Sequence, residues 1–560
     1  MKRLISFLIC MMFLLTACTG GQSGSPSTDA PKTDEPTANV TEAPTEPATE
    51  APTEAPTEAP TEPVTEPVTE SPFKDPDPEV LAAPEATQFT VSKALGNDMV
   101  IQRNEYIRIW GFANEDQNGR RVNAEFGGLT GAAIIEDGHW LITLNGSLPE
   151  STEPRQMRVY GDGVEVTFEN VLVGDVYWVV GQSNVHYTVT DIKNEPLANE
   201  LGRTVRISNS DLIRLNRNAS ADYTGKAQGT TDVYEDVLIK RGWQKPEQGA
   251  SLFSAIGYFT AIQVYDKLEG KVPIGMIEFD GNGLGLNSFC PNEVCDATKM
   301  DKADKNGIYH CTGVINNGPS RFMYNHYMYP FQNMPISGII WYQGESDMQS
   351  PNDTKYPARF RALITELRDR HDQINHDYPV YIIEFPPIKT NYFPYASVRT
   401  YMGTIPNVLD NAHLCQSSDL WKDMTYGNNL HPYIKWEQAE RMANIILAGV
   451  YGIGDPTYVE GPSAMSVTYE NDGLTALVKF RNVGSGLKFE GGEAKGIKIK
   501  TSSTWIAPES VEIVGTDTLK ITATKKIKYI GYNTADNDMF PETITLCNSE
   551  GVPCNAFILK

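Results

Sequence analysis

The stretch Asp175-Val-Tyr-Trp-Val-Val-Gly-Gln-Ser-Asn184 is the strongest indication of the fold. Its first half is almost entirely apolar, as expected for a strand that is buried on both faces of a parallel sheet. The glycine that follows permits a tight turn, so Ser183 can begin the next helix. Backbone N–H groups at such a position can stabilise a negatively charged oxygen. Alone, the pattern is weak evidence for catalysis, because serine often caps helices for purely structural reasons.

Similar apolar runs recur between residues 171 and 455 and alternate with helical patterns. Residues 273–279, 336–342 and 378–385 are strongly apolar. Between them, residues 360–367 place apolar side chains at the i, i+3, i+4 and i+7 positions of a helix face. Buried strands that alternate with amphipathic helices predict an α/β sandwich with a mainly parallel sheet, whose sites lie at the carboxyl ends of the strands.

The regions on either side, residues 87–170 and 456–560, have a different pattern. Short segments such as 106–110, 121–126 and 476–480 alternate between apolar and polar residues. Together with frequent turn residues, this alternation predicts an antiparallel β domain on each flank. These domains could support the α/β region by packing or could bind carbohydrate on their surface, and we favour the packing role.

The first 18 residues have the form of an export signal. Two basic residues precede an apolar run from Leu4 to Leu15, which is shorter than the roughly 20 residues of a membrane-spanning helix. The run ends at Leu15-Thr16-Ala17-Cys18, which resembles a bacterial lipobox. In such signals the cysteine is lipidated, so Cys18 is expected to hold the protein on the extracellular face of the cell membrane. The alternative is an ordinary signal peptide in which the cysteine occurs by chance.

Residues 19–86 consist mainly of Pro, Thr, Glu and Ala in short repeats and contain almost nothing apolar enough to bury. They are expected to form an extended, disordered linker. Fifteen acidic residues against two lysines give this segment a net charge of −13, more than half of the −24 of the whole chain. The rest of the chain is therefore only mildly acidic, and nucleic acid is not an expected partner.

The cysteines do not suggest a metal site. Six lie beyond the signal and linker, and no two of them form a Cys-x-x-Cys pair: Cys290, Cys295, Cys311, Cys415, Cys547 and Cys554. The close pairs 290/295 and 547/554 could form disulfides outside the cell, and the sequence leaves this open. No cluster of histidines and carboxylates has the spacing of metal ligands, and no cofactor is expected.

A serine nucleophile needs a base, and the chain has eight histidines. His186 is too close to Ser183 in sequence to be the usual partner, and His310 and His413 cannot be dismissed by context. His431 lies in Gly-Asn-Asn-Leu-His-Pro, just before the last helix of the α/β region, where a catalytic histidine can reach the edge of the sheet. From the residues alone, a structural role for this histidine stays open.

A third segment, residues 341–347, places the polar side chains of Gln-Gly-Glu-Ser-Asp directly after an apolar strand. The three segments together resemble the sialate O-acetylesterase family of the SGNH hydrolase superfamily. That family has Gly-Asp-Val-Trp and Gly-Gln-Ser-Asn, then Trp-Tyr-Gln-Gly-Glu-Ser, then Ile-His-Pro with a lysine soon after. The corresponding segments here are Gly174 to Tyr177, Gly181 to Asn184, Trp341 to Ser346, and Leu430 to Pro432 with Lys435. The similarity also includes both flanks.

The resemblance implies a three-layer α/β/α sandwich with flanking β domains and an acetyl-enzyme mechanism. Ser183 would attack the acetyl carbonyl, and His431 would take its proton. The N–H of Ser183 would contribute to the oxyanion hole, together with Gly281 and Asn282, whose segment only partly matches the family's Gly-Gly-Thr. Gln343 and Glu345 would shape the site.

One departure from the family concerns the acid that usually precedes the histidine by two or three residues. This chain has Asn428 and Asn429 there. A neutral amide can orient an imidazole but cannot stabilise imidazolium as a carboxylate does. Asp423 or Asp419 could supply the carboxylate instead, or activity could be low. We favour a serine–histidine dyad with an orienting partner such as Asn429.

The sequence therefore favours a carbohydrate O-acetylesterase that acts on acetylated oligo- or polysaccharides such as xylan or mannan, or on acetylated sialic acid. The main alternative is a surface carbohydrate-binding lipoprotein with a weak or inactive site, which the missing acid suggests. A lipase-like esterase is less favoured, because the Gly-x-Ser-x-Gly elbow of such enzymes is absent.

Overall fold

The computed structural model describes residues 71–194, 210–219, 228–238, 241–312, 318–347, 352–384, 395–420, 431–534 and 544–560. Residues 70–560 form one compact unit. The predicted signal, residues 1–18, and most of the predicted linker, residues 19–86, lie outside the described part. None of the helices within these ranges has the length and apolar character needed to cross a bilayer.

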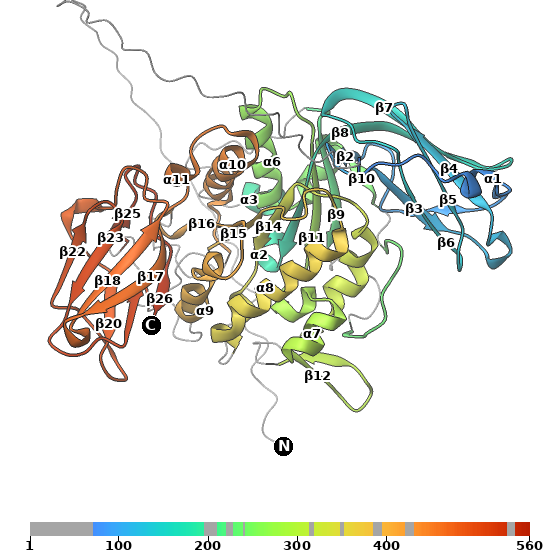
Figure 1. Ribbon diagram of the computed structural model, residues 1–560. Coiled ribbons are helices and arrows are strands. Elements are labelled where there is room, and N and C mark those ends of the chain that lie inside the picture. Colours follow the sequence, from blue (N-terminus) through green and yellow to red (C-terminus); the bar gives the residue numbers. More distant parts are fainter. Residues whose placement is uncertain are drawn as a thin grey trace, which may run out of the picture. The chain divides into compact units, whose positions relative to one another are not determined.

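A central sheet with the strand order β10-β9-β11-β8-β14-β15-β16 dominates the middle of the chain (Figure 1). All neighbouring pairs are parallel except β9 with the short edge strand β10. Every residue of β11 and β14 is buried, which requires cover on both faces. The strands are β8 (Glu165–Gly181), β9 (Ile213–Ala219), β10 (Trp243–Gln244), β11 (Ile274–Asp280), β14 (Gly338–Tyr342), β15 (Val380–Ile383) and β16 (Ala412–Cys415).

Helices cover the sheet on opposite faces. Successive residues of a strand point to opposite sides. Val179 lies against Gly257 of α6, whereas the ring of its neighbour Trp178 contacts His371 of α8, with 4.6 Å between centroids. α10 packs on α6, and α7 and α9 pack on α8 (Figure 1). The helices are α6 (Ala255–Lys267), α7 (Asn292–Thr298), α8 (Asn352–His371), α9 (Tyr395–Met402) and α10 (Lys435–Tyr451). The predicted α/β/α class is confirmed.

Strand β8 is 17 residues long and belongs to two parts of the fold. Its first half pairs antiparallel with β7, and its second half pairs parallel with β11 and β14. The boundary expected between residues 170 and 171 therefore lies inside a continuous strand. The other strands of the flanking region are β1 (Thr90–Val91), β2 (Val100–Gln102), β3 (Arg108–Phe112), β4 (Arg121–Phe126), β5 (Leu129–Ile134), β6 (His139–Thr143) and β7 (Ser151–Tyr160).

The last ten residues before the expected start of this β region, residues 77–86, are ordered against it. They contain the short helix α1 (Pro78–Ala82), and Arg121 donates to the carbonyl of Ala83 and pairs with Glu85 at 2.7 Å. The β region thus includes the last residues of the predicted linker, because this arginine has hydrogen-bonding partners there.

The C-terminal β domain has its own hydrophobic core, which includes Val478, Leu519, Ile530 and Phe557. Its main strands form two four-stranded sheets, in the orders β17-β18-β23-β22 and β21-β20-β24-β26. They are β17 (Ser463–Glu470), β18 (Thr475–Arg481), β20 (Ile497–Lys500), β21 (Trp505–Ile506), β22 (Ser510–Val514), β23 (Thr518–Thr522), β24 (Tyr529–Tyr532) and β26 (Phe557–Leu559). A further short pair joins β19 (Lys488–Phe489) to β25 (Leu546–Cys547).

The six cysteines beyond the linker are all buried, and all are free thiols. The two close pairs for which the sequence left disulfides open are thus unbonded in the structure.

Candidate active site

Ser183 lies at the carboxyl edge of the central sheet. Strand β8 ends at Gly181, which is in register with Asp280 of β11 and Tyr342 of β14, and the short helix α2 (Ser183–His186) follows. A Cβ atom at Gly181 would lie 2.1 Å from the carbonyl oxygen of Tyr342. Glycine is therefore required here to let two strands approach closely at the point where the chain turns into α2.

The groups of Ser183 are available for chemistry. The first backbone bonds of α2 run from the N–H groups of Val185 and His186 to the carbonyl of Gln182, at 2.9 and 3.0 Å. Neither the N–H nor the hydroxyl of Ser183 takes part in a hydrogen bond with the described residues. This arrangement leaves a backbone donor and a hydroxyl side by side at the sheet edge.

The structure brings His431 next to α2. Its imidazole stacks on the ring of Tyr187, with 5.7 Å between centroids and 14° between planes, and Tyr187 caps α2 by donating to the carbonyl of Ser183. Burial lowers the pKa of His431 to about 4, and the charge of Lys435 lowers it further, whereas Asp191 acts in the opposite direction. His431 is therefore neutral at pH 7, the state that a general base requires.

Three segments predicted to form the site meet at the buried side chain of Asn184. Its amide donates to Glu345 Oε1 at 2.5 Å, and its carbonyl accepts from Lys435 Nζ at 2.7 Å. Burial raises the pKa of Glu345 to about 7 and lowers that of Lys435 to about 7. The ammonium also lies 4.5 Å from the centroid of Tyr342. The network fixes α2 to the loop after β14 and to the start of α10.

Replacing Lys435 by methionine is expected to lower the free energy of unfolding by about 3 kcal/mol, because it removes the buried cation that Glu345 faces and the donor that Asn184 accepts from. Urea denaturation followed by circular dichroism measures this change. The double variant Lys435→Met/Glu345→Gln should recover part of the loss, whereas the exposed control Lys305→Met should cost almost nothing. Additive losses in the double variant would show that the two side chains do not interact.

Gln343 lies in a second buried network and not on an open surface. Its amide donates to Asp347 at 2.7 Å and to the carbonyl of Leu284 at 3.1 Å, and Tyr356 donates to its side-chain oxygen at 2.8 Å. Gln343 is completely buried and Glu345 is 2% exposed. Both side chains thus connect the loop after β14 to neighbouring segments.

The loop after β11 contains the residues expected to complete the oxyanion hole. The N–H of Gly281 donates to the carbonyl of Gly181 at 3.2 Å, so it is engaged in the backbone. Asn282 is exposed and forms no hydrogen bond with the described residues. Of these two residues, only Asn282 has an uncommitted N–H in this arrangement.

A series of interacting polar side chains that the sequence analysis missed starts one helical turn after Ser183. His186 Nδ1 lies 2.8 Å from Asp280, a fully buried carboxylate at the end of β11. Glu278, two residues earlier on the same strand, is also fully buried and accepts from Arg217 at 3.3 Å. Burial and the neighbouring Asp280 raise the pKa of Glu278, which favours a proton on the Glu278 carboxyl.

Asp280 could have been found from the sequence. It directly follows the apolar run 273–279, the same position that drew attention to residues 343–347. His186 was set aside because it lies close to Ser183 in sequence. A histidine at that spacing can still join the site through a residue from another strand.

The expected partners of His431 are only partly within the described residues. Asn429 and Asp423 lie outside them, as does Cys18. Asp419 is described, and its two carboxylate oxygens accept from Arg441 at 2.7 and 2.9 Å, so it is paired elsewhere. In the described part of the chain, no group of three or more His, Cys, Asp and Glu side chains is arranged to hold a metal ion.

Comparisons with known proteins find similarity to acetylesterases. Residues 314–427 match the model of a family described as carbohydrate esterase, sialic acid-specific acetylesterase. The sialate O-acetylesterase of Pongo abelii is 25% identical over 409 residues, which cover 67% of this chain and 73% of that protein. The human sialate O-acetylesterase is 24% identical over 401 residues, with the same coverage.

The fold also matches a solved structure. A carbohydrate acetylesterase from Xanthomonas citri superposes with a TM-score of 0.67 at 21% identity, covering 84% of this chain and all of the other. This likeness extends well beyond the central sheet and supports the α/β/α fold with β domains on its flanks.

Proposed function

We propose that this chain, a carboxylic ester hydrolase of the sialate O-acetylesterase family, removes O-acetyl groups from carbohydrate with Ser183 as nucleophile and His431 as base. The observation that carries this proposal is the geometry at the end of β8. There the hydroxyl and N–H of Ser183 are uncommitted, and a neutral imidazole stacks beside the same short helix.

In the proposed reaction, His431 accepts the proton of Ser183 as the hydroxyl oxygen attacks the acetyl carbonyl. The N–H of Ser183 donates to the resulting oxyanion, and the N–H of Asn282 is a second candidate donor. His431 then protonates the departing sugar oxygen, which leaves an acetyl group on Ser183. Water attacks this ester with His431 again as base, and acetate is released.

The proposed dyad does not depend on the acid that the family usually has before its histidine. Stacking on Tyr187 restricts the orientation of His431. Asn429 or Asp423 is the proposed hydrogen-bonding partner of the imidazole. Asp191 is a further candidate for stabilising imidazolium, because its charge raises the pKa of His431.

Acetate release from a panel of substrates tests the proposed function and its substrate class. The panel contains acetylated xylan, acetylated mannan, acetylated mucin and O-acetyl sialic acid, and each is incubated with the parent chain and with the Ser183→Ala variant. We expect release by the parent alone, and the substrate released fastest identifies the sugar. Negligible release by both proteins from every substrate would instead favour the carbohydrate-binding lipoprotein.

We also propose that a lipid on Cys18 anchors the protein to the outer face of the bacterial cell membrane, with the Pro/Thr/Glu-rich linker as a spacer. The support is the lipobox-like sequence and the composition of residues 19–86. Metabolic labelling with an alkyne fatty acid should mark the parent chain but not Cys18→Ala, and equal labelling of both would contradict the anchor.

A further inference from the structure

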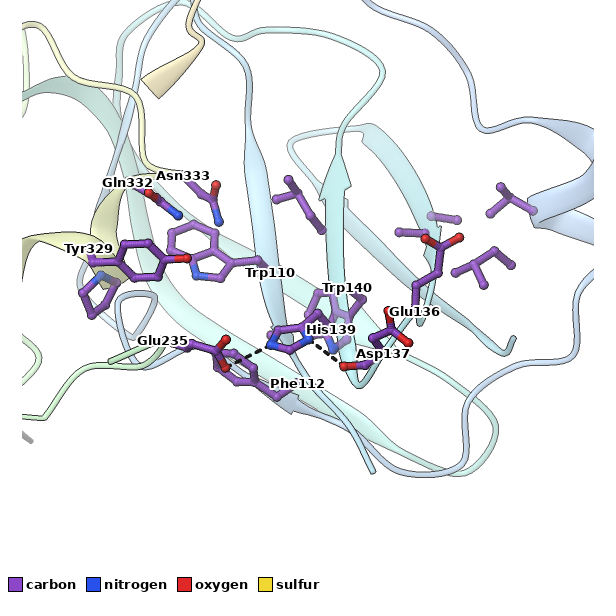
Figure 2. A pocket seen from close by; sticks show the side chains of 17 residues that line it. Trp110, Phe112, Glu136, Asp137, His139, Trp140, Glu235, Tyr329, Gln332 and Asn333 are labelled. Atoms are coloured by element: carbon purple, nitrogen blue, oxygen red, sulfur yellow. Dashed lines mark hydrogen bonds and ion pairs between the residues drawn. The ribbon is translucent and has the colours of Figure 1, made fainter. Parts of the chain in front are cut away.

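A cavity of about 740 Å³ lies away from Ser183, against the small sheet β1-β3-β6 (Figure 2). We call it the Trp110 pocket, and its lining includes Trp110, Phe112, His139, Leu141 and the segment 329–333. Its volume falls within the usual range for small-molecule sites. Nothing in the esterase mechanism uses it.

The pocket lies near the amino ends of the parallel strands, whereas the catalytic residues lie at their carboxyl ends. The segment 329–333 ends shortly before the amino end of β14, and the N–H of Ser337 donates to the carbonyl of Val176 near the start of the parallel part of β8. Ser183 follows the carboxyl ends of the same strands. A ligand in this pocket would therefore not be the ester that reacts.

One wall of the pocket is apolar and partly aromatic. Phe112 is in register with His139, and Trp110 with Leu141, so these four side chains share one face of the sheet. Leu141 is 45% exposed although it is large and apolar. Trp110 is only 5% exposed, so Leu141 and the partly buried Phe112 provide the apolar surface that suits the C–H face of a sugar ring.

Uncommitted hydrogen-bonding groups gather beside that wall. Figure 2 shows the hydroxyl of Tyr329 and the amides of Gln332 and Asn333 grouped around the indole of Trp110. None of these three side chains forms a hydrogen bond with another described residue. Carboxamides donate and accept together, which matches pairs of neighbouring sugar hydroxyls.

The charges around the pocket select against acidic ligands. The lining contains three carboxylates, those of Glu136, Asp137 and Glu235, and one histidine. His139 lies 2.7 Å from the carbonyl of Asp137 and 3.0 Å from the carboxylate of Glu235. Because both partners are acceptors, both ring nitrogens donate in the protonated form, and the bond to Glu235 raises the pKa of His139. The net charge of the lining stays negative even with this histidine protonated.

We propose that the Trp110 pocket binds a neutral oligosaccharide and is a second carbohydrate site, separate from the catalytic centre. It combines an apolar wall with uncommitted amide and hydroxyl groups, and its negative charge disfavours sialic and uronic acids. On a polymer, this site would hold the chain to its substrate while Ser183 acts elsewhere.

Isothermal titration calorimetry tests the site directly. The full chain with Ser183→Ala is titrated with unacetylated xylohexaose, with mannohexaose and with 3′-sialyllactose, so that no ester is present. We expect at least one neutral sugar to bind and sialyllactose to bind at least tenfold more weakly. Adding Tyr329→Phe, Gln332→Ala and Asn333→Ala should weaken binding of the neutral sugar at least tenfold, since each lost hydrogen bond costs about 1 kcal/mol.

Two controls show whether a loss of binding arises in the pocket itself. Asn306→Ala removes an exposed carboxamide from the loop between β12 (Asp301–Ala303) and β13 (Tyr309–Cys311) and should leave binding unchanged. In the presence of Ser183, the triple variant should hydrolyse 4-nitrophenyl acetate at the parent rate, which shows that the fold is intact. The proposal is overturned if no neutral sugar binds at about 10 mM, if the triple variant binds as the parent does, or if sialyllactose binds equally well.

Discussion

Replacing Ser183 by alanine is expected to lower kcat for acetyl-ester hydrolysis by about 10⁴-fold or more, because the nucleophile of a serine hydrolase has no substitute. The hydroxyl forms no hydrogen bond with the described residues, so its removal should leave the thermal unfolding midpoint almost unchanged. Initial rates with 4-nitrophenyl acetate, together with a circular dichroism melt, measure both effects.

A serine far from the catalytic centre provides the matched control for this experiment. Ser485 is exposed in the C-terminal β domain, and Ser485→Ala should retain the full rate. A Ser183→Ala variant that is folded and still hydrolyses the ester within tenfold of the parent would contradict the assignment of the nucleophile.

Replacing His431 by alanine is expected to reduce kcat by about 10³- to 10⁴-fold, since it removes the group that accepts and returns the proton. The parent enzyme should also show an unusual pH dependence. Only the neutral imidazole can act as base, and its pKa is lowered to about 4, so kcat/KM should fall as the pH drops through about 4 and not near 6.5. Initial rates between pH 3 and 8 give this profile.

A substitution at His186 tests whether this histidine, and not His431, is the general base. It pairs with Asp280 beside the same helix, so His186→Ala should reduce the rate by a smaller factor and leave the acidic limb in place. If His186→Ala abolished activity while His431→Ala retained it, His186 would be the base.

The sequence predicted the architecture because its strongest patterns are set by burial. The runs at residues 175–180, 273–279 and 336–342 are predominantly apolar, and all three contribute buried strands to the central sheet. The boundary at residue 170 could not be predicted in the same way. Strand β8 changes from antiparallel to parallel neighbours without any break in the chain, so no turn residue marks the change.

The geometry of the candidate site was predicted less completely. Motif spacing pointed to Ser183, His431 and Glu345. It did not show that Asn184 connects Glu345 to Lys435 through hydrogen bonds. Contacts between side chains from distant strands depend on register, which a single sequence does not contain. The chain from His186 through Asp280 toward Glu278 was missed for the same reason.

The central claim is that Ser183 is an activated nucleophile, and labelling with a fluorophosphonate followed by tandem mass spectrometry tests it most directly. We predict stoichiometric labelling of the parent chain on the peptide that contains Ser183, with little labelling in Ser183→Ala and much slower labelling in His431→Ala. Labelling of a different serine, or none in a preparation that releases acetate, would contradict the account.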